Sequence, residues 1–363
     1  MPELYGTYQT KEALLRKIGN ISQIAGVRSC EGTEGNERGV QAVDFRTGTG
    51  FHFTVLPGRG MDVSFAEHCG RPLCWRSSTG DIGASFFEPE DLGWLRSFSG
   101  GLVVTCGLSN VGAPCFDDGE KLGLHGRIAH IPAKHVYVDG KWVDDEYVMW
   151  AQGTMRESRV FGENLALTRR VWAKLGENRL FLEDTVENLG FEPAPLMLLY
   201  HINGGYPAVD EGSELVSPTE SVAPRDEEAE RGLEEYAVFQ KPTPGFKERV
   251  YYHEMKADEE GRVHAALINR SFDNGAGFGF YVAYRKEALD RFTEWKMNGE
   301  GTYVVGMEPA NCVVDGRANV RARGELKFIL PGEQKQFELE IGVLASKKEI
   351  EAFEEKVRRI KGK

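Results

Sequence analysis

The sequence predicts an all-β protein, built as two large stacked sheets that are mainly antiparallel, with a few short helices. Apolar and polar residues alternate through most of the chain and are interrupted by glycine turns, which is typical of sheets with one buried face. Helical periodicity is found only near the two ends of the chain. At 363 residues the chain exceeds the usual size of one compact domain, but large β-sandwiches reach this length as one unit.

The strand signal recurs in five segments along the chain. Within the second segment, Asp139-Gly140 predicts a hairpin turn between two alternating stretches. Within the third, Gly176 and Asn178 mark a similar turn. In order, the five segments are residues 39–75, 135–155, 165–190, 277–297 and 324–344.

Helices are expected at two places. A short amphipathic helix is expected over residues 9–19. A C-terminal helix is expected over about 346–361, because Ser346 can cap it and Glu349 stands at the spacing of a capping box.

One segment interrupts the strand pattern. Residues 210–248 are acidic and contain several prolines, and we interpret them as a long excursion across one sheet edge, with a linker between domains as the alternative. The expected organisation is one domain over residues 1–363, with an N-terminal extension of about 1–40 and the C-terminal helix.

Charge and composition narrow the classes of function. Acidic residues number 56 and basic residues 44, a net charge of −12, and no block of Lys or Arg stands out, so we expect no nucleic-acid partner. The chain contains neither a signal-peptide core nor a stretch long enough to span a membrane, and we expect no membrane partner. Six scattered cysteines without a CxxC pair indicate reduced thiols and a cytoplasmic protein. An uncovered sheet edge could pair to form a homodimer.

The stretch PLMLLYHINGGYP, residues 195–207, is the first candidate for chemistry. Its apolar run predicts a buried strand, on which alternation places His201 and Asn203 on the same face. The following Gly-Gly permits a sharp turn and close approach of a ligand. A hydrogen-bonded core histidine is the structural alternative to a catalytic one.

The stretch EWKMNGEGTYVVGMEPANC, residues 294–312, is the second candidate. We expect a strand that ends at Glu308, with Pro309 holding that residue extended. A carboxylate at the end of an apolar strand is costly unless it has partners or a substrate, although a surface glutamate is the simpler interpretation. Trp295 could stack on a ligand, and Lys296 could contact a substrate or an anionic substituent, unless it is solvated.

Two further stretches add possible ligand contacts. In GLHGRIAHIPAKH, residues 123–135, three histidines recur at intervals of five, which matches neither one face of a strand nor one face of a helix, so no metal site is expected. The HGR triplet instead indicates a loop that presents His125 and Arg127 to a polar ligand. In LPGRGMDVSF, residues 56–65, Arg59 and Asp62 could contact a substrate or form a buried ion pair.

Together these pieces resemble the aldose 1-epimerase (galactose mutarotase) family, and most of all a bacterial epimerase-like branch of it. The resemblance covers nearly the whole chain. It is carried by four segments: TVENLGFEPAPLMLLYHINGGYP, YVVGMEPANC, LHGRIAHIPA and FILPGEQKQFELEIGV. In the position where this chain has YHINGGYP, the central family has a different sequence around its histidine.

The resemblance implies a β-supersandwich fold and an enzyme that interconverts the α and β anomers of a sugar. It implies that His201 is the general acid and Glu308 the general base. Because both residues are expected at strand ends, we expect them on either side of the bound sugar. It also implies that His125 binds substrate hydroxyls, with Arg127 and Arg59 nearby. Such a reaction needs a base for the anomeric hydroxyl and an acid for the ring oxygen, but neither a metal nor another cofactor.

Alternatives remain at this level. A non-catalytic carbohydrate-binding protein would keep the aromatic and polar groups without needing an acid and a base. A metal-dependent sugar isomerase is disfavoured by the histidine spacing, and a lyase or hydrolase is a third possibility. Four arginines in the segments expected near the site raise the possibility of a phosphorylated, sulfonated or acidic sugar: Arg59, Arg76, Arg96 and Arg127.

Overall fold

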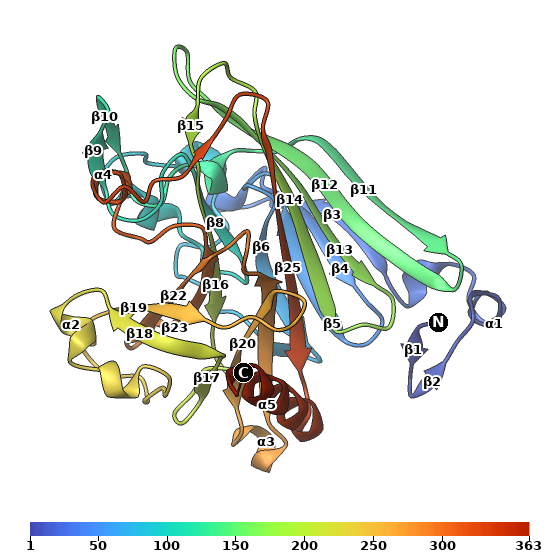
Figure 1. Ribbon diagram of the computed structural model, residues 1–363. Coiled ribbons are helices and arrows are strands. Elements are labelled where there is room, and N and C mark those ends of the chain that lie inside the picture. The colour runs from blue at the N-terminus through green and yellow to red at the C-terminus, as the bar shows by residue number, and fades with distance from the viewer. Residues whose placement is uncertain (363) are drawn as a thin grey trace.

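The computed structural model describes residues 1–362, and its strands form two stacked layers (Figure 1). One layer is a sheet of eight antiparallel strands. Its order is β11 (Lys134–Val143), β12 (Glu146–Ser158), β13 (Asn164–Lys174), β14 (Arg179–Asn188), β25 (Gln334–Leu344), β21 (Phe278–Arg285), β20 (Arg262–Asn269) and β17 (Glu214–Val216).

The second layer consists of two sheets placed edge to edge. An isolated bridge joins Val63 of β6 (Asp62–His68) to Val103, the residue before β8 (Val104–Leu108). The five-stranded sheet has the order β3 (Gly26–Glu31), β4 (Gln41–Arg46), β5 (Phe51–Leu56), β6 (Asp62–His68) and β7 (Arg71–Pro72). The six-stranded sheet has the order β18 (Thr219–Pro224), β19 (Arg249–Met255), β22 (Arg291–Asn298), β23 (Tyr303–Ala310), β16 (Met197–Gly204) and β8 (Val104–Leu108).

One hydrophobic core fills the space between the layers. It takes alternate residues from all three sheets, such as Phe53 on β5, Leu182 on β14 and Met307 on β23, each less than 1% exposed. Burying a side chain of this size contributes roughly 1.5–3 kcal/mol, so this shared core is the main force that holds the layers together. The prediction of two stacked, mainly antiparallel sheets is confirmed.

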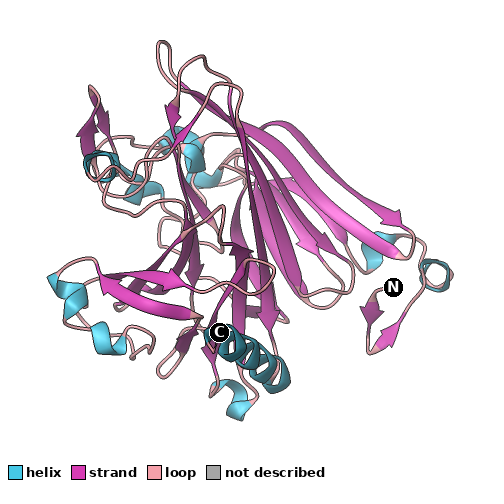
Figure 2. Ribbon diagram, viewed as in Figure 1, coloured by secondary structure: helices cyan, strands magenta, loops and turns pink. Residues whose placement is uncertain are grey.

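Helices are few and lie at the periphery (Figure 2). The α-helices are α1 (Lys11–Leu15), α2 (Glu227–Glu230), α3 (Phe272–Gly275), α4 (Arg317–Ala322) and α5 (Lys347–Lys361). Short 3₁₀ turns span Ile21–Gln23, Gly35–Glu37, Ala84–Phe86, Gly93–Ser97, Ile128–His130 and Leu233–Glu235. Two-stranded sheets pair β1 (Glu3–Leu4) with β2 (Thr7–Tyr8), β9 (Cys115–Asp117) with β10 (Glu120–Leu122), and β15 (Ala194–Pro195) with β24 (Phe328–Ile329).

Helix α5 begins where the sequence predicts. The Ser346 side chain accepts a hydrogen bond from the Glu349 N–H, as in a capping box. Ile350, Phe353 and Val357 then pack against the outward face of β20 and β25. The expected N-terminal helix is shorter than predicted and spans only Lys11–Leu15.

Three predictions about organisation need correction. The Asp139-Gly140 turn is wrong, because β11 continues through both residues and the chain reverses after Val143. The segment 210–248 does more than cross an edge, since it supplies β17 to the eight-stranded sheet and β18 to the six-stranded sheet. The N-terminal extension already contains β3 of the five-stranded sheet.

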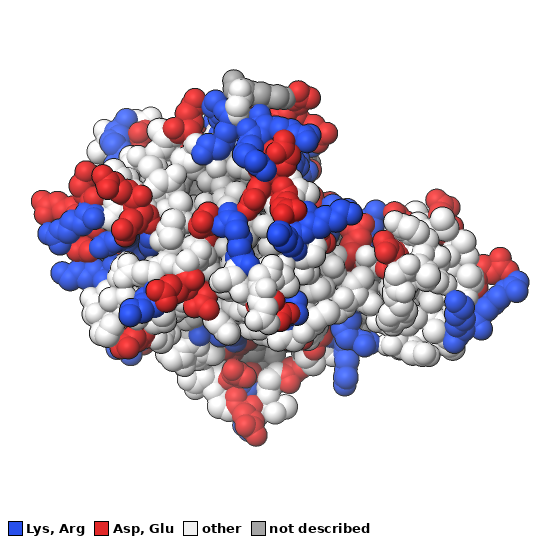
Figure 3. All heavy atoms as spheres, turned by 90° about the horizontal axis from the view of Figure 1, so that it is seen from below, with Lys and Arg blue, Asp and Glu red and all other residues white. Residues whose placement is uncertain are grey.

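The surface is mixed in charge. Basic and acidic side chains are interspersed over the face shown in Figure 3. Within residues 1–362 no helix is both long and apolar enough to cross a membrane.

Candidate active site

His201 and Glu308 meet on neighbouring strands of the six-stranded sheet. The register that pairs Leu199 with Ala310 and Ile202 with Met307 sets His201 on β16 opposite Glu308 on β23. His201 Nε2 lies 3.0 Å from Glu308 Oε1, and the two side chains are 6% and 3% exposed. Strand pairing therefore brings together an imidazole and a carboxyl group that are about a hundred residues apart in sequence.

The pair lies on the face of the sheet and not at the strand ends where the sequence placed it. β23 does not stop at Glu308 but runs on to Ala310. Its ladder to β16 has no pairing at Glu308 and Pro309, which fits a proline that has no N–H to donate. Gly306 provides the space for the carboxyl group, because a Cβ there would lie 2.5 Å from Glu308 Oε1.

A cavity of about 570 Å³ covers the pair, a volume within the range of small-molecule sites. Aromatic rings form much of its wall, and the ring centroids of Phe98 and Trp295 lie 5.2 and 5.3 Å from that of His201. Stacked aromatic rings with a few polar groups are a common lining for a sugar. The principal lining residues are Trp75, Trp94, Phe98, His125, His201, Arg225, Glu248, Trp295, Thr302 and Glu308.

The glycine pair at the end of β16, Gly204-Gly205, makes room for one residue of this wall. A Cβ on Gly205 would lie 2.6 Å from the backbone nitrogen of Trp75, so only glycine lets the Trp75 segment pass this close to β16. The Trp75 N–H donates to the carbonyl of Asn203 at 3.0 Å, which fixes the segment in place. The sharp turn therefore positions an aromatic wall residue.

His125 enters the cavity from the loop between β10 and the turn at Ile128–His130. Its φ of 56° is a left-handed conformation that costs energy for a residue other than glycine, so the surrounding contacts must hold it. Its N–H donates to the Gly112 carbonyl and its carbonyl accepts from the Gly107 N–H, each at 3.0 Å. Its ring lies 5.9 Å from that of His201 and 4.8 Å from that of Trp94.

Three buried polar atoms of the cavity wall have no hydrogen-bond partner among the described residues. They are Trp94 Nε1, His125 Nδ1 and His201 Nδ1. Buried polar atoms are normally satisfied, because leaving one unpaired costs about 1–3 kcal/mol. Their convergence on one cavity is what a site built to bind a polar ligand would show.

Burial sets the protonation of the pair. Desolvation raises the pKa of Glu308 well above its ordinary value, and nearby Glu248 raises it further while Arg225 opposes the rise. Burial, followed by the proximity of His125, lowers the pKa of His201 to about 3. Burial also lowers the pKa of His125 to about 4. Burial therefore favours a protonated Glu308 beside a neutral His201 over the corresponding ion pair.

Two charged cavity residues come from the segment 210–248 and were not anticipated. Arg225 follows β18 and Glu248 precedes β19, and Arg225 Nη2 lies 3.0 Å from Glu248 Oε1. The other oxygen of Glu248 accepts a 2.9 Å hydrogen bond from Trp295 Nε1. Nothing in the acidic, proline-containing sequence distinguishes these two residues from their solvated neighbours, so only the folded path of the segment identifies them.

Two predicted ligand residues, Arg59 and Arg127, lie elsewhere. Arg59 is buried, and its guanidinium donates to the carbonyls of Ala129 and Ser97 at 3.0 Å each, where it ties loops together. Arg127 is half-exposed and turns toward Glu120, 3.6 Å away. Neither lines the cavity, so the predicted contact with a ligand there is corrected for both.

Asp62 and Asn203 also have structural partners in place of a ligand. Asp62 Oδ1 accepts from Arg169 Nη1 at 2.9 Å, so it forms a buried ion pair with that residue and not with Arg59. Asn203 shares the face of His201, as predicted from alternation, but its amide donates to the carbonyls of Gly101 and His201.

Lys296 faces away from the cavity, which corrects its assignment as a substrate contact. It is adjacent to Trp295 on β22, and successive strand residues point to opposite faces. Its ammonium group donates to the carbonyls of Glu235 and Val238 at 2.6 Å each.

The three histidines at 125, 130 and 135 do not converge. His130 Nε2 lies 2.7 Å from Ser97 Oγ and its ring stacks on Phe87, away from His125. His135 is exposed on β11. Among residues 1–362, no group of three or more His, Cys, Asp or Glu side chains is arranged to hold a metal ion.

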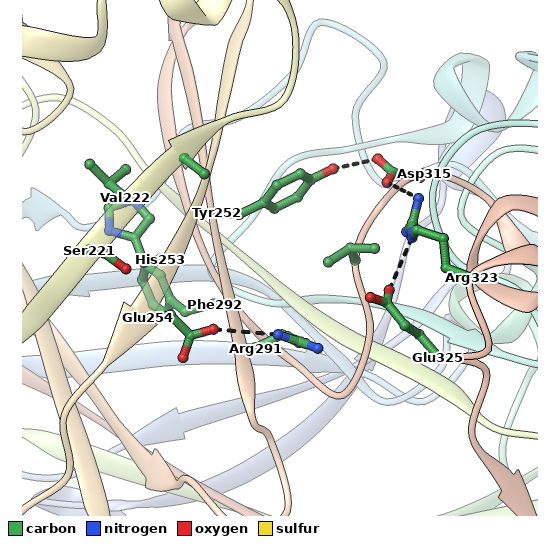
Figure 4. Close-up of a pocket in the computed structure, with 12 residues that line it drawn as sticks. Ser221, Val222, Tyr252, His253, Glu254, Arg291, Phe292, Asp315, Arg323 and Glu325 are labelled. Atoms are coloured by element: carbon green, nitrogen blue, oxygen red, sulfur yellow. Dashed lines mark hydrogen bonds and ion pairs between the residues drawn. The ribbon is translucent and has the colours of Figure 1, made fainter.

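A second cavity, of about 300 Å³, borders the same sheet (Figure 4). Its polar groups bond to one another: the Tyr252 hydroxyl donates to Asp315 at 2.6 Å, Arg323 pairs with Asp315 at 2.9 Å, and Arg291 lies 3.4 Å from Glu254. These groups have partners already, so this cavity shows much less unmet hydrogen-bonding capacity than the one at His201.

Comparisons with known proteins agree with this architecture. Residues 37–343 match the family described as a domain of unknown function, DUF4432. No curated protein matched the sequence. Among solved structures, a Klebsiella pneumoniae protein described as a "putative aldose 1-epimerase" is 27% identical with a TM-score of 0.87, covering 94% of this chain and 91% of that one.

Two more distant structures share the fold. A galactose mutarotase-like protein from Clostridium acetobutylicum is 13% identical with a TM-score of 0.61, covering 89% of this chain and 99% of that one. A galactose 1-epimerase from Lactobacillus acidophilus is 12% identical with a TM-score of 0.52, with the same coverage. The structural similarity to aldose 1-epimerases and galactose mutarotase-like proteins that the sequence motifs implied is confirmed.

Proposed function

The chain belongs to the DUF4432 family, and we propose that this member is an aldose 1-epimerase-like isomerase that interconverts the α and β anomers of an uncharged monosaccharide. The observation that carries the proposal is the buried pair of His201 and Glu308 under an aromatic cavity whose polar wall atoms lack partners. A carboxyl group and an imidazole within 3.0 Å of each other supply an acid and a base at one point.

Side-by-side placement suits this reaction. The anomeric hydroxyl oxygen and the ring oxygen are bonded to the same carbon, so both can face an adjacent acid and base. One group removes the hydroxyl proton while the other protonates the ring oxygen, the bond from the anomeric carbon to the ring oxygen breaks, and an open-chain aldehyde forms. Rotation about the next carbon–carbon bond and reclosure with the proton transfers reversed gives the other anomer. The acid and base thus act from one side of the sugar and not across its ring.

The number of protons that the His201–Glu308 pair holds matches what the proposed reaction needs. Each half-reaction needs one group protonated and the other not, and the pair holds one such proton whether it resides on Glu308 or on His201. The family resemblance makes His201 the acid, whereas burial favours the proton on Glu308. Each group acts once as acid and once as base in a full cycle, and each contributes roughly 10²- to 10⁴-fold to the rate.

The charges of the cavity favour an uncharged sugar. None of Arg59, Arg76, Arg96 and Arg127, which had raised the possibility of an anionic substrate, lines the cavity. Arg225 does line it but is paired with Glu248 and also with Asp226, 2.8 Å away. A phosphate or carboxylate would therefore meet Glu248 without a free cation to offset its charge.

Location and assembly are part of the same proposal. All six cysteines carry free thiols, which fits the reducing cytoplasm. A homodimer through a sheet edge stays a prediction.

Exchange spectroscopy by NMR tests the function. Purified protein added to a panel of aldoses at anomeric equilibrium should speed the exchange of the two C1 proton signals for at least one uncharged sugar, and should leave 6-phosphorylated and uronic sugars unaffected. His201→Asn should remove the acceleration while circular dichroism shows an intact fold. Binding of sugars without any acceleration would instead identify a carbohydrate-binding protein, and metal-dependent acceleration would point to a different isomerase.

A further inference from the structure

Lys296 is a buried cation that the proposed reaction does not use. It is 1% exposed, and its ammonium group donates to the carbonyls of Glu235 and Val238 at 2.6 Å and of Tyr236 at 3.4 Å. It also lies 5.3 Å from the centre of the Phe239 ring. A buried ammonium is costly unless its three donors are satisfied, and here one turn of the chain supplies all three acceptors.

That turn belongs to the opposite layer of the sandwich. The Leu215 N–H on β17 donates to the Ala237 carbonyl at 2.8 Å, and the Phe239 N–H donates to the Ser213 carbonyl at 2.9 Å. Residues 237–239 thus extend the edge of the eight-stranded sheet, whereas Lys296 projects from the six-stranded sheet. The lysine ties the two layers at this edge, in the yellow segment between α2 and β19 (Figure 1).

The same segment reaches the cavity at its other end. It finishes at Glu248, which is held by Trp295 Nε1 at 2.9 Å and by Arg225 at 3.0 Å. Two consecutive residues of β22 therefore hold this segment at two points. Lys296, on the inner face of the sheet, holds the turn at 235–238, and Trp295, on the cavity face, holds Glu248. We propose that Lys296 is a positioning residue that fixes segment 233–248, so that Glu248 and Arg225 border the cavity and the sugar binds tightly. This inference rests on the proposed function, because it assigns the segment to the affinity of that site.

Lys296→Met tests it, since methionine keeps most of the length and removes the donors. Amide hydrogen exchange over residues 233–248 should become faster than in the wild type, and KM for the sugar should rise about tenfold while kcat stays within about twofold. Lys286→Met is the matched control, because Lys286 also donates to a main-chain carbonyl, that of Met255 at 2.6 Å, but lies outside the segment. Lys286→Met should leave the amide exchange of residues 233–248 and the KM for the sugar unchanged.

The outcomes separate this inference from the proposed function. Unchanged exchange of residues 233–248 in a folded Lys296→Met variant would overturn the positioning role. The exchange measurement needs no turnover, so a wild type without isomerase activity would refute the function and still allow the anchor to be judged. If Lys296→Met does not fold, Lys296→Gln, which keeps an N–H donor, should fold and show an intermediate exchange rate. Wild-type exchange and KM in that variant would also count against the role of the charge.

Discussion

The six-stranded sheet carries two buried His–Glu pairs, one on each face. On the face toward the cavity, His201 Nε2 lies 3.0 Å from Glu308 Oε1, and on the face toward the core, His253 Nε2 lies 3.1 Å from Glu294 Oε2. Each pair joins neighbouring strands, β16 with β23 and β19 with β22. The two pairs are nearly identical in chemistry and distance, so what differs is their surroundings.

The second nitrogen of each imidazole shows the difference. His253 Nδ1 lies 3.0 Å from Thr219 Oγ1, so both of its ring nitrogens have partners, and the side chains of His253 and Glu294 are 0% exposed. His201 Nδ1 has no partner and its ring lines a cavity of about 570 Å³. A His–Glu contact by itself does not indicate a site. Unmet hydrogen-bonding capacity that faces a cavity does: His201 Nδ1 belongs to a ring that lines the larger of the two cavities, whereas Glu294 Oε1, which also has no partner, belongs to a residue that lines neither of them.

The largest expected effect concerns stability and should distinguish the pairs. His253→Asn leaves Glu294 buried without its partner, and we expect it to lower the free energy of unfolding by about 3 kcal/mol. His201→Asn removes a ring that faces a cavity, and we expect a loss of about 1 kcal/mol or less. Urea unfolding at pH 4.5 measures both. Equal losses would mean that the His201 pair is as structural as the inner one.

A smaller effect is expected from substituting Gly306, because the pair of His253 and Glu294 has no matching glycine. In the ladder between β22 and β23, Gly306 lies opposite Trp295, whereas Glu294 lies opposite Met307. A Cβ at 306 would lie 2.5 Å from Glu308 Oε1, so Gly306→Ala must displace the carboxyl group. We expect kcat for anomer exchange to fall about tenfold with KM little changed, because misplaced catalytic groups affect the transition state more than binding. An unaltered kcat would contradict the proposed position of Glu308.

The smallest effect is in the pH dependence of stability. Between pH 4.5 and 6.5, the ordinary pKa values of Glu and His, the unfolded pair holds one proton, on the imidazole. The folded pair also holds one, because burial raises the pKa of Glu308 and lowers that of His201 to about 3. The pair therefore adds no slope to the wild-type unfolding free energy in this range.

His201→Asn breaks that balance. Folded Glu308 keeps its proton at pH values where the unfolded carboxyl group loses it, so the unfolding free energy of the variant should fall relative to the wild type as pH rises. Urea unfolding at several pH values between 4.5 and 6.5 measures the difference. Parallel curves for variant and wild type would show that Glu308 is ionised in the folded protein.

Much of the fold could be predicted from the sequence, because alternation and glycine turns report which residues are buried. Register and path could not, since they depend on contacts between distant segments. Asp139-Gly140 has the composition of a hairpin turn, yet the chain reverses after Val143 instead, and β11 pairs with β12 without a break at those two residues. Likewise, no local signal sets His201 opposite Glu308.

The site was predicted in part for the same reason. Alternation correctly places His201 and Asn203 on one face, and the same rule already implies that Trp295 and Lys296 cannot both face the cavity. Arg59 illustrates the limit, because a guanidinium bonded to main-chain carbonyls has no sequence signature that separates it from one that binds a ligand.

The most direct test of the central claim compares Glu308→Gln with Glu294→Gln in anomer exchange on the same uncharged aldose. Both changes replace a buried carboxyl group by an amide of the same shape. We predict that Glu308→Gln lowers the exchange rate by roughly 10²-fold or more and that folded Glu294→Gln stays within about twofold of the wild type. Equal activity of the two variants would contradict the assignment of acid–base chemistry to the pair that faces the cavity.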